Sequence, residues 1–239
     1  MAGSLKCLFP RHDGPDLPVT LINTAGGITG GDRFNIDMTA GPETGVTITT
    51  QAAERIYRAQ DTAFGSLETR LTVKRGATLK WLPQETILFD QSRLQRRLHV
   101  DLHHDAGLLL VEPVLFGRTE MGEQVTHGHF IDRVEIWRSG RPVFIDRTRL
   151  SGAIASRLAH TAIADGARAM ALVVYVGTDA EAQLTSIRRT LPKTCGASLL
   201  SPDLLVARFL TTDGFALRSA LIPALHRLGK SEIPRCWTL

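Results

Sequence analysis

Hydrophobic and polar residues alternate along most of the first 150 positions, with the two-residue period of half-buried β-strands. Gly, Pro and Asp clusters separate the alternating stretches and predict turns. Ser139-Gly140 separates two further stretches, 134–138 and 141–145, and predicts a hairpin. The predicted strands are Leu17–Ile22, Arg33–Met38, Val46–Thr50, Leu67–Val73, Thr78–Leu82, Leu98–Leu102 and Leu108–Leu115. This part of the chain therefore favours a mainly β fold.

The spacing of these strands limits the architecture. Short strands that recur between turns are typical of a sandwich, a barrel or a β-helix. The residues themselves do not repeat with a fixed period, which is evidence against a regular solenoid.

The pattern changes after Leu150. Residues 151–160 fit either a short helix or a loop, and Ala169–Val176 is an apolar run typical of a buried strand. Thr178 and Glu181 have the spacing of a capping box, which predicts a helix that ends before Pro192.

Two strands and a second helix follow this first helix. The strands are predicted at Ala197–Leu200 and Leu204–Leu210, and the helix begins at Asp213. Its pattern predicts a kink at Pro223 and a C-cap at Gly229. The residues expected on its inward face are Phe215, Leu221, Leu225 and Leu228. We expect one domain over 1–239, in which a β-rich part (1–150) shares its core with a β-α-β-β-α tail (165–230).

The glycine-rich stretch Asn23–Asp32 lies between two predicted strands. Its order, Gly-Gly-x-x-Gly-Gly-Asp, lacks the Lys-Ser/Thr of a P-loop and the spacing of a dinucleotide fingerprint. Asp32 would also repel an anion. We therefore interpret the four glycines as a bulge or a turn that crosses between sheets, with a ligand cradle as the less favoured alternative.

Composition and charge exclude several classes. No apolar run reaches the roughly 20 residues of a membrane helix, and the N-terminus has no signal-peptide core, so we expect a cytoplasmic protein without a membrane partner. Three widely spaced cysteines form no zinc or redox motif. The net charge is +4. The densest basic cluster, 93–97, lacks interleaved aromatic residues, which favours a solvated strand face or an acidic protein partner over nucleic acid.

Candidate chemistry is sparse. His127 and His129 share one face of a predicted strand, and imidazole and carboxylate groups are ligands for nickel and similar ions. A second group contains His99, His103 and His104, with Asp101 and Asp105 beside them. An exposed strand face or loop is the alternative interpretation for both groups. Glu112 follows a buried apolar run, where a carboxylate must be paired. No Gly-x-Ser-x-Gly or His-Glu-x-x-His motif occurs.

Several motifs in order along the chain resemble the UreD family (also called UreH) of urease accessory proteins. The similar segments are Asn23–Asp32, Thr49–Arg58, Gly76-Ala77, Trp81–Asp90, Phe116–Arg118, Met121–Glu123, Leu205–Phe209 and Pro234–Trp237. The residues that carry the motifs are Gly26, Gly27, Gly30, Gly31, Asp32, Thr50, Tyr57, Trp81, Pro83, Gln84, Glu85, Gly117, Arg118, Gly122 and Glu123.

The resemblance implies a non-catalytic scaffold for nickel insertion into apo-urease. Proteins of this family bind urease subunits and UreF, which recruits the GTPase UreG, so a hetero-oligomer without a tightly bound cofactor is expected. The implied fold is a β-helix-like body with two helices in the C-terminal third. Family members usually carry a further β-rich segment before the position of Ser4, so either the start of this sequence is assigned late or the first strands are missing, and missing strands would expose an unpaired sheet edge.

A nickel ion in transit is the one metal that the resemblance suggests. The candidate side chains along its route are Glu85, Glu112, Glu123, His127 and His129. The competing hypothesis is an independent β protein that binds a metal or a small molecule.

Overall fold

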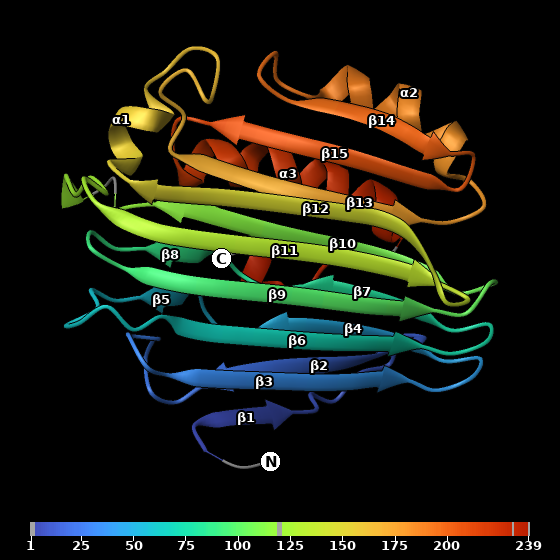
Figure 1. Cartoon of the computed structure of the whole chain (residues 1–239). Helices are drawn as coiled ribbons and strands as arrows, with labels where there is room; N and C mark the ends of the chain where they lie inside the picture. The colour runs from blue at the N-terminus through green and yellow to red at the C-terminus, as the bar shows by residue number, and fades with distance from the viewer. Residues whose placement is uncertain (1–2, 119–120, 231, 239) are drawn as a thin grey trace.

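Two β-sheets stacked face to face form the body of the protein, as a computed structural model shows (Figure 1). The structure describes residues 3–118, 121–230 and 232–238. The prediction of a mainly β fold is confirmed.

Sheet A is the larger of the two and includes strands from both halves of the chain. Its main path runs β1-β2-β4-β7-β10-β13-β15-β14, and β5 and β8 pair beside β10. The strands are β1 (Leu5–Leu8), β2 (Asp16–Asn23), β4 (Gly45–Thr50), β5 (Glu54–Ile56), β7 (Thr78–Leu82), β8 (Thr86–Leu88), β10 (Gly107–Phe116), β13 (Ala169–Val176), β14 (Gly196–Ser201) and β15 (Leu204–Thr211).

Sheet B has five strands in the order β12-β11-β9-β6-β3. They are β3 (Arg33–Ala40), β6 (Gly65–Val73), β9 (Arg93–Leu102), β11 (Gly128–Arg138) and β12 (Arg141–Gly152). The turn between β11 and β12 is the predicted hairpin, and both Ser139 and Gly140 have the positive φ that a tight turn requires.

The chain winds between the two sheets like a solenoid. Parallel pairs join β2, β4, β7 and β10 in sheet A, and other parallel pairs join β3, β6, β9 and β11 in sheet B. Successive coils begin at Asp16, Gly45, Thr78 and Gly107, about 30 residues apart. A structural period therefore exists without a sequence repeat, because stacked coils require only that inward positions stay apolar. The β-helix-like body implied by the resemblance is confirmed.

Three apolar clusters fill the molecule. Inward side chains such as Leu79, Val100 and Leu110 pack between the two sheets. The opposite face of sheet A carries Val173 and Phe209 and packs against two long helices, α2 (Ala180–Thr190) and α3 (Gly214–Gly229). Figure 1 shows both helices on this side of sheet A. A third cluster lies at one end, beside the short helix α1 (Ile154–Leu158).

The helices lie near their predicted positions but begin and end differently. The N-cap of α2 is Asp179 rather than Thr178, and its carboxylate bonds Tyr175, Gln183 and Lys230 instead of a helix amide, so the predicted capping box is wrong. Among the described residues, no helix is both long and apolar enough to cross a membrane.

The last helix, α3, departs from its predicted pattern at both ends. Asp213 caps it by accepting a hydrogen bond from the Ala216 amide, as expected for a helix that begins there. Phe215 is 82% exposed, so its predicted inward position is wrong. It stands in the first turn, beyond the edge of the sheet core. The C-cap is Lys230 in the left-handed conformation, and Gly229 is the last helical residue rather than the cap.

The glycine-rich stretch is a turn that carries the chain from sheet A to sheet B. Gly26 and Gly31 have φ values of 79° and 88°, which favour glycine. The Asp32 carboxylate accepts a hydrogen bond from the Thr29 amide and closes the turn. A Cβ on Gly27 would lie 2.5 Å from the Arg55 carbonyl oxygen, and one on Gly30 would lie 2.9 Å from that of Ala63. The interpretation as a sheet-crossing turn is confirmed.

We predict that Gly27→Ala lowers the free energy of unfolding by about 1–3 kcal/mol, because the added methyl group forces a fixed backbone carbonyl to move. Gly14→Ala is the control, since a Cβ there meets no atom within 4 Å. Urea unfolding measures both variants. Equal midpoints for the two would contradict the close approach at Gly27.

Candidate functional site

Three charged side chains meet between the two sheets. Glu112 extends from β10 of sheet A, and Arg96 and Asp132 extend from β9 and β11 of sheet B. Arg96 Nη1 lies 2.5 Å from Glu112 Oε2, and its Nε and Nη2 donate to the two oxygens of Asp132 at 2.9 and 2.6 Å. All three residues are buried, and none of them is more than 8% exposed. We call this group the buried cluster.

Neutral groups complete the hydrogen bonding of the buried cluster. Trp81 Nε1 donates to the second oxygen of Glu112 at 2.6 Å. Arg96 Nη1 also donates to the hydroxyl of Thr86 at 3.2 Å. Both oxygens of each carboxylate therefore have a donor, as buried charges require.

The alternation of β9 explains how the buried cluster forms. Leu94, Leu98 and Val100 point into the core, and Arg96 occupies an inward position of the same series. The parallel register places Arg96 directly beside Asp132. Sequence reasoning found Glu112 but missed Arg96 and Asp132. A charged residue at an inward position of an alternating strand is the signal that could have found Arg96.

Two carboxylates share one guanidinium in the buried cluster, and this imbalance affects the pKa of Glu112. Burial, and secondarily the nearby Asp132 charge, raise the pKa of Glu112 above its ordinary value of 4.5, against the attraction of Arg96. Burial alone would lower the pKa of Arg96, but Asp132 and Glu112 raise it overall, so the guanidinium stays charged.

Cavities lie on both sides of the buried cluster. The first, the Glu54 cavity, has a volume of about 170 Å³, and the second, the Arg208 cavity, has about 290 Å³. Most of the wall of the Glu54 cavity is apolar, and its other lining residues include Asn23, Thr50, Glu54, Pro83, Arg96 and Glu112. The Arg208 cavity is lined in part by Glu112, Asp132, Asp146, Thr148, Thr194 and Arg208. Glu112 lines both, so the buried cluster separates them.

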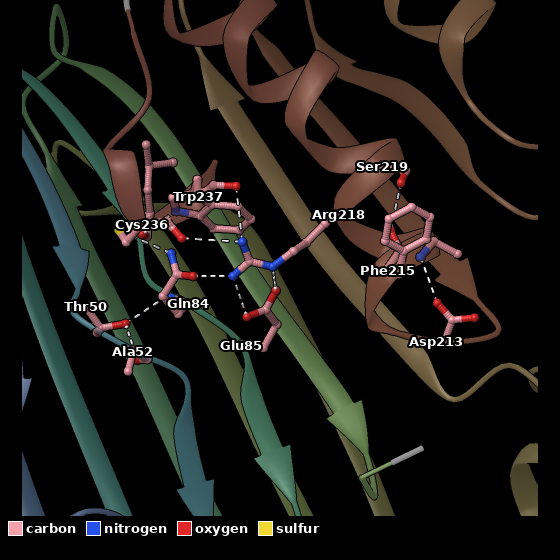
Figure 2. Close-up of polar contacts among 12 residues, drawn as sticks. Thr50, Ala52, Gln84, Glu85, Asp213, Phe215, Arg218, Ser219, Cys236 and Trp237 are labelled. Carbon is pink, nitrogen blue, oxygen red and sulfur yellow. Dashed lines mark hydrogen bonds and ion pairs between the residues drawn. The ribbon is translucent and has the colours of Figure 1, made fainter. Parts of the chain in front are cut away.

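Arg218 of α3 joins the helix to the connection between β7 and β8. Figure 2 shows its guanidinium among Gln84, Glu85 and the C-terminal residues. Its Nε and Nη2 donate to the two oxygens of Glu85 at 2.7 and 3.0 Å, and Nη2 also donates to the side chain of Gln84. The Thr50 hydroxyl oxygen accepts a hydrogen bond from the backbone amide of Gln84 at 2.9 Å.

The same arginine fixes the C-terminal segment. Arg218 Nη1 donates to the carbonyl oxygen of Trp237 at 3.1 Å, and the guanidinium lies over the Trp237 ring. The indole nitrogen donates to the Leu82 carbonyl oxygen at 3.0 Å. Both oxygens of Glu85 are therefore bound to Arg218 in a structural ion pair. Because the same guanidinium also binds the Trp237 carbonyl oxygen, it holds the Trp81–Glu85 motif next to the Pro234–Trp237 motif.

Other motif residues meet where the chain crosses between the sheets. The Tyr57 hydroxyl donates to the Gly26 carbonyl oxygen at 3.1 Å, and its ring contacts Phe89 edge-on. The Arg118 guanidinium lies over the Phe89 ring, with its central carbon 4.3 Å from the ring centre. Arg118 Nε also donates to Glu123 at 2.8 Å.

Glu123 is held by its own loop. Its second oxygen accepts a hydrogen bond from the Asp90 amide at 3.3 Å, and these bonds lower the pKa of Glu123 despite the opposing effect of burial. Gly117 and Gly122 both have positive φ, and a Cβ on Gly117 would lie 2.6 Å from the Glu123 carbonyl oxygen. The loop glycines are thus required by turn geometry.

The two candidate histidines do not line either cavity. His127 lies in an exposed loop, where its amide donates to Asp90 at 3.0 Å. His129 lies on the outer face of sheet B, and its Nδ1 is 2.9 Å from the Ser151 hydroxyl. The candidate ligands are therefore dispersed: Glu112 lies in the core, Glu85 lies beside α3, and Glu123 lies in a loop.

The second group of histidines lies at the turn between β9 and β10. His103 Nδ1 is 2.5 Å from Asp105 Oδ1, and the ring of His104 lies next to that of His103. Ligand atoms of these three residues come within 4.8 Å of one another. Hydrogen bonds from the Gly76 amide and His103 lower the pKa of Asp105 to about 2. His99 bonds Asp101 separately, at 3.0 Å.

We predict that Arg96→Met lowers the free energy of unfolding by about 3–5 kcal/mol, because it leaves two buried carboxylates without a counter-charge. Arg97→Met is the matched control, since the neighbouring side chain is exposed, and we expect a change below about 0.5 kcal/mol. The Arg96→Met deficit should shrink as the pH falls toward 4.5, because protonation of Glu112 removes a buried charge. Urea unfolding at several pH values measures this. Equal stability of the two variants would contradict the assignment.

Comparison with known proteins gives one consistent result. The family described as UreD urease accessory protein matches residues 1–238. A urease accessory protein UreD of Ruegeria pomeroyi is 53% identical over 238 residues, which cover all of this chain and 93% of the relative. The corresponding proteins of Roseobacter denitrificans and Ruegeria sp. TM1040 are 49% and 47% identical, and the match covers all of this chain and 87% and 82% of those relatives.

These matches agree with the ordered motifs and with the solenoid-like fold. They extend over both sheets, the two long helices and the C-terminal segment that Arg218 holds. The chain belongs to the UreD family of urease accessory proteins.

Proposed function

We propose that this chain is a non-catalytic scaffold that binds apo-urease and recruits a UreF–UreG assembly for nickel insertion. The observation that carries the proposal is the family match over residues 1–238, together with relatives named urease accessory protein. The scaffold acts in the cytoplasm as part of a hetero-oligomer, without nucleic acid and without a tightly bound cofactor.

The physical role of a scaffold is to raise the local concentration of the loaded metal donor. Selectivity for nickel cannot rest on raw affinity, because other divalent ions compete for the same nitrogen and oxygen ligands. Holding UreG, through UreF, against apo-urease makes delivery intramolecular and therefore favours the intended acceptor. GTP hydrolysis belongs to UreG, which is consistent with the glycine-rich turn of this chain serving its backbone geometry.

The two cavities support a route for nickel through the chain. Glu112 lines both, and the buried cluster carries two carboxylates for one guanidinium. A surplus negative charge between the two cavities attracts a cation, while Arg96 limits the strength of binding, so that the ion is released again. Glu54, whose pKa burial raises, adds a carboxyl group on the wall of the Glu54 cavity.

A pair of variants tests this route. Glu112→Gln keeps the shape of the side chain, leaves Arg96 paired with Asp132 and removes the surplus charge, together with one of the two acceptor oxygens that face Arg96 and Trp81. We expect it to lower the nickel content of urease matured with it. The double variant His127→Ala with His129→Ala should leave the nickel content unchanged, since neither residue lines a cavity. If the nickel content instead fell only with the double histidine variant, the route would pass the surface histidines and not Glu112.

The scaffold role is tested in a nickel-fed host that carries the remaining genes of a cognate urease cluster. We expect urease activity with this chain, and nickel-poor, inactive urease without it. Urease activity and the nickel content of purified urease are the two measurements. Urease fully loaded with nickel without the chain would contradict the proposal and would favour an independent β protein that binds a metal or a small molecule.

A further inference from the structure

Five arginines lie close together on the outer face of sheet B. This arginine patch consists of Arg93, Arg97, Arg133, Arg147 and Arg149, on the neighbouring strands β9, β11 and β12. Sheet B lies at the front of the molecule in Figure 1, and α2 and α3 lie on the far side of sheet A. The outer face of sheet B is therefore open to a partner.

The strand registers place the arginines beside one another. Arg97 is opposite Arg133, and Arg133 is opposite Arg147, so three guanidinium groups form one row across three strands. Arg149 is two residues along β12 and stands opposite Ile131. Arg93 begins β9 and stands opposite His129. Neighbouring strands are about 4.8 Å apart, so these arginines are direct neighbours on the outer face of the sheet.

The patch is not neutralised within the chain. Arg133 pairs with Glu135 on its own strand. The structure gives the other four arginines no ion pair with any residue it describes. The Nε atoms of Arg93 and Arg133 are buried and have no acceptor there either. Like charges opposite one another destabilise a sheet, and unpaired buried donors add to that cost.

The positive charges of the patch also affect the pKa of His129, which lies among the arginines. Burial lowers the pKa of His129, and the charges of Arg93 and Arg149 lower it further. Positive charges on β9 and on β12 therefore both act on His129, which lies between them on β11.

The surroundings of the patch lack a platform for stacking bases, which favours an acidic polypeptide over nucleic acid as the ligand. Glu135 pairs with Arg133 inside the patch, and Glu68 lies opposite Arg97 at its border, so the five arginines still exceed the two acids. Phe64 lies beneath Arg93, so its ring offers no free surface for stacking a base. Arginine pairs bidentately with carboxylates, and Ile145, which is 49% exposed, gives an apolar contact beside Arg147.

We propose that the arginine patch on the outer face of sheet B is a docking surface for an acidic polypeptide segment. Glu or Asp side chains of the segment pair with Arg97, Arg147 and Arg149, which are exposed and have no ion pair with any residue that the structure describes. The proposal goes beyond the scaffold function, since it assigns one face and the chemistry of its partner.

The test uses the full chain and a fluorescent peptide of alternating Glu and Ser, with binding measured by fluorescence anisotropy. The patch variant combines Arg97→Glu, Arg147→Glu and Arg149→Glu. We expect it to bind the peptide at least about tenfold more weakly, because like charges then face each other. It should instead bind a peptide of alternating Lys and Ser. Binding to the unchanged chain should weaken with added salt.

A matched control separates the patch from net charge. The control variant combines Arg11→Glu, Arg157→Glu and Arg189→Glu, three exposed arginines outside sheet B, and has the same net charge as the patch variant. We expect it to bind the Glu-Ser peptide much more tightly than the patch variant does. Equal loss in both variants would overturn the proposal.

Two further measurements cover the remaining outcomes. Arg97→Gln with Arg147→Gln relieves repulsion without reversing charge, so it should keep its thermal unfolding midpoint and still lose part of the peptide affinity. A lowered midpoint with unchanged affinity would mean that the arginines serve the fold, which overturns the proposal. Oligothymidylate is the competing probe, and patch-dependent binding of it without binding of the peptide would also overturn the proposal.

Discussion

The bonds from Arg96 to Glu112 and Asp132 constrain how the two sheets stack. Glu112 belongs to sheet A, while Arg96 and Asp132 belong to sheet B, so the ion pairs cross the interior. A slip of β9 by one residue would turn Arg96 outward and leave both carboxylates buried without a counter-charge. Apolar side chains alone would tolerate other registers of similar volume. The buried cluster therefore selects one register from several that the hydrophobic pattern permits.

Arg218 performs a comparable task on the other side of sheet A. It binds Glu85 in the connection between two strands, and it binds the backbone of Trp237 at the end of the chain. Helix α3, the sheet and the C-terminal segment thus share one guanidinium. Arg218 explains why the Trp81–Asp90 and Pro234–Trp237 segments meet in space, and both Arg96 and Arg218 are held by oxygens from distant parts of the sequence.

Charge is distributed unevenly between the interior and the outer face of sheet B. The interior has a surplus carboxylate at the buried cluster, next to two cavities, whereas the outer face carries the arginine patch. The same strand, β9, supplies both, since Arg96 points inward and Arg97 points outward. The proposed cation route and the proposed docking surface therefore lie on opposite faces of one strand and carry opposite charges.

The sequence by itself located most of the strands and the two long helices and identified the family, because these depend on local patterns, but it missed the short strands β1, β5 and β8. Alternation located the strands, and the ordered motifs identified the relatives. The tertiary structure decided what depends on register and contact. It paired Arg96 with Asp132, aligned three arginines across sheet B, turned Phe215 to solvent and gave the cap of α2 to Asp179. These contacts form between residues that are distant in the sequence, and the pattern of a single strand does not show which of them become neighbours.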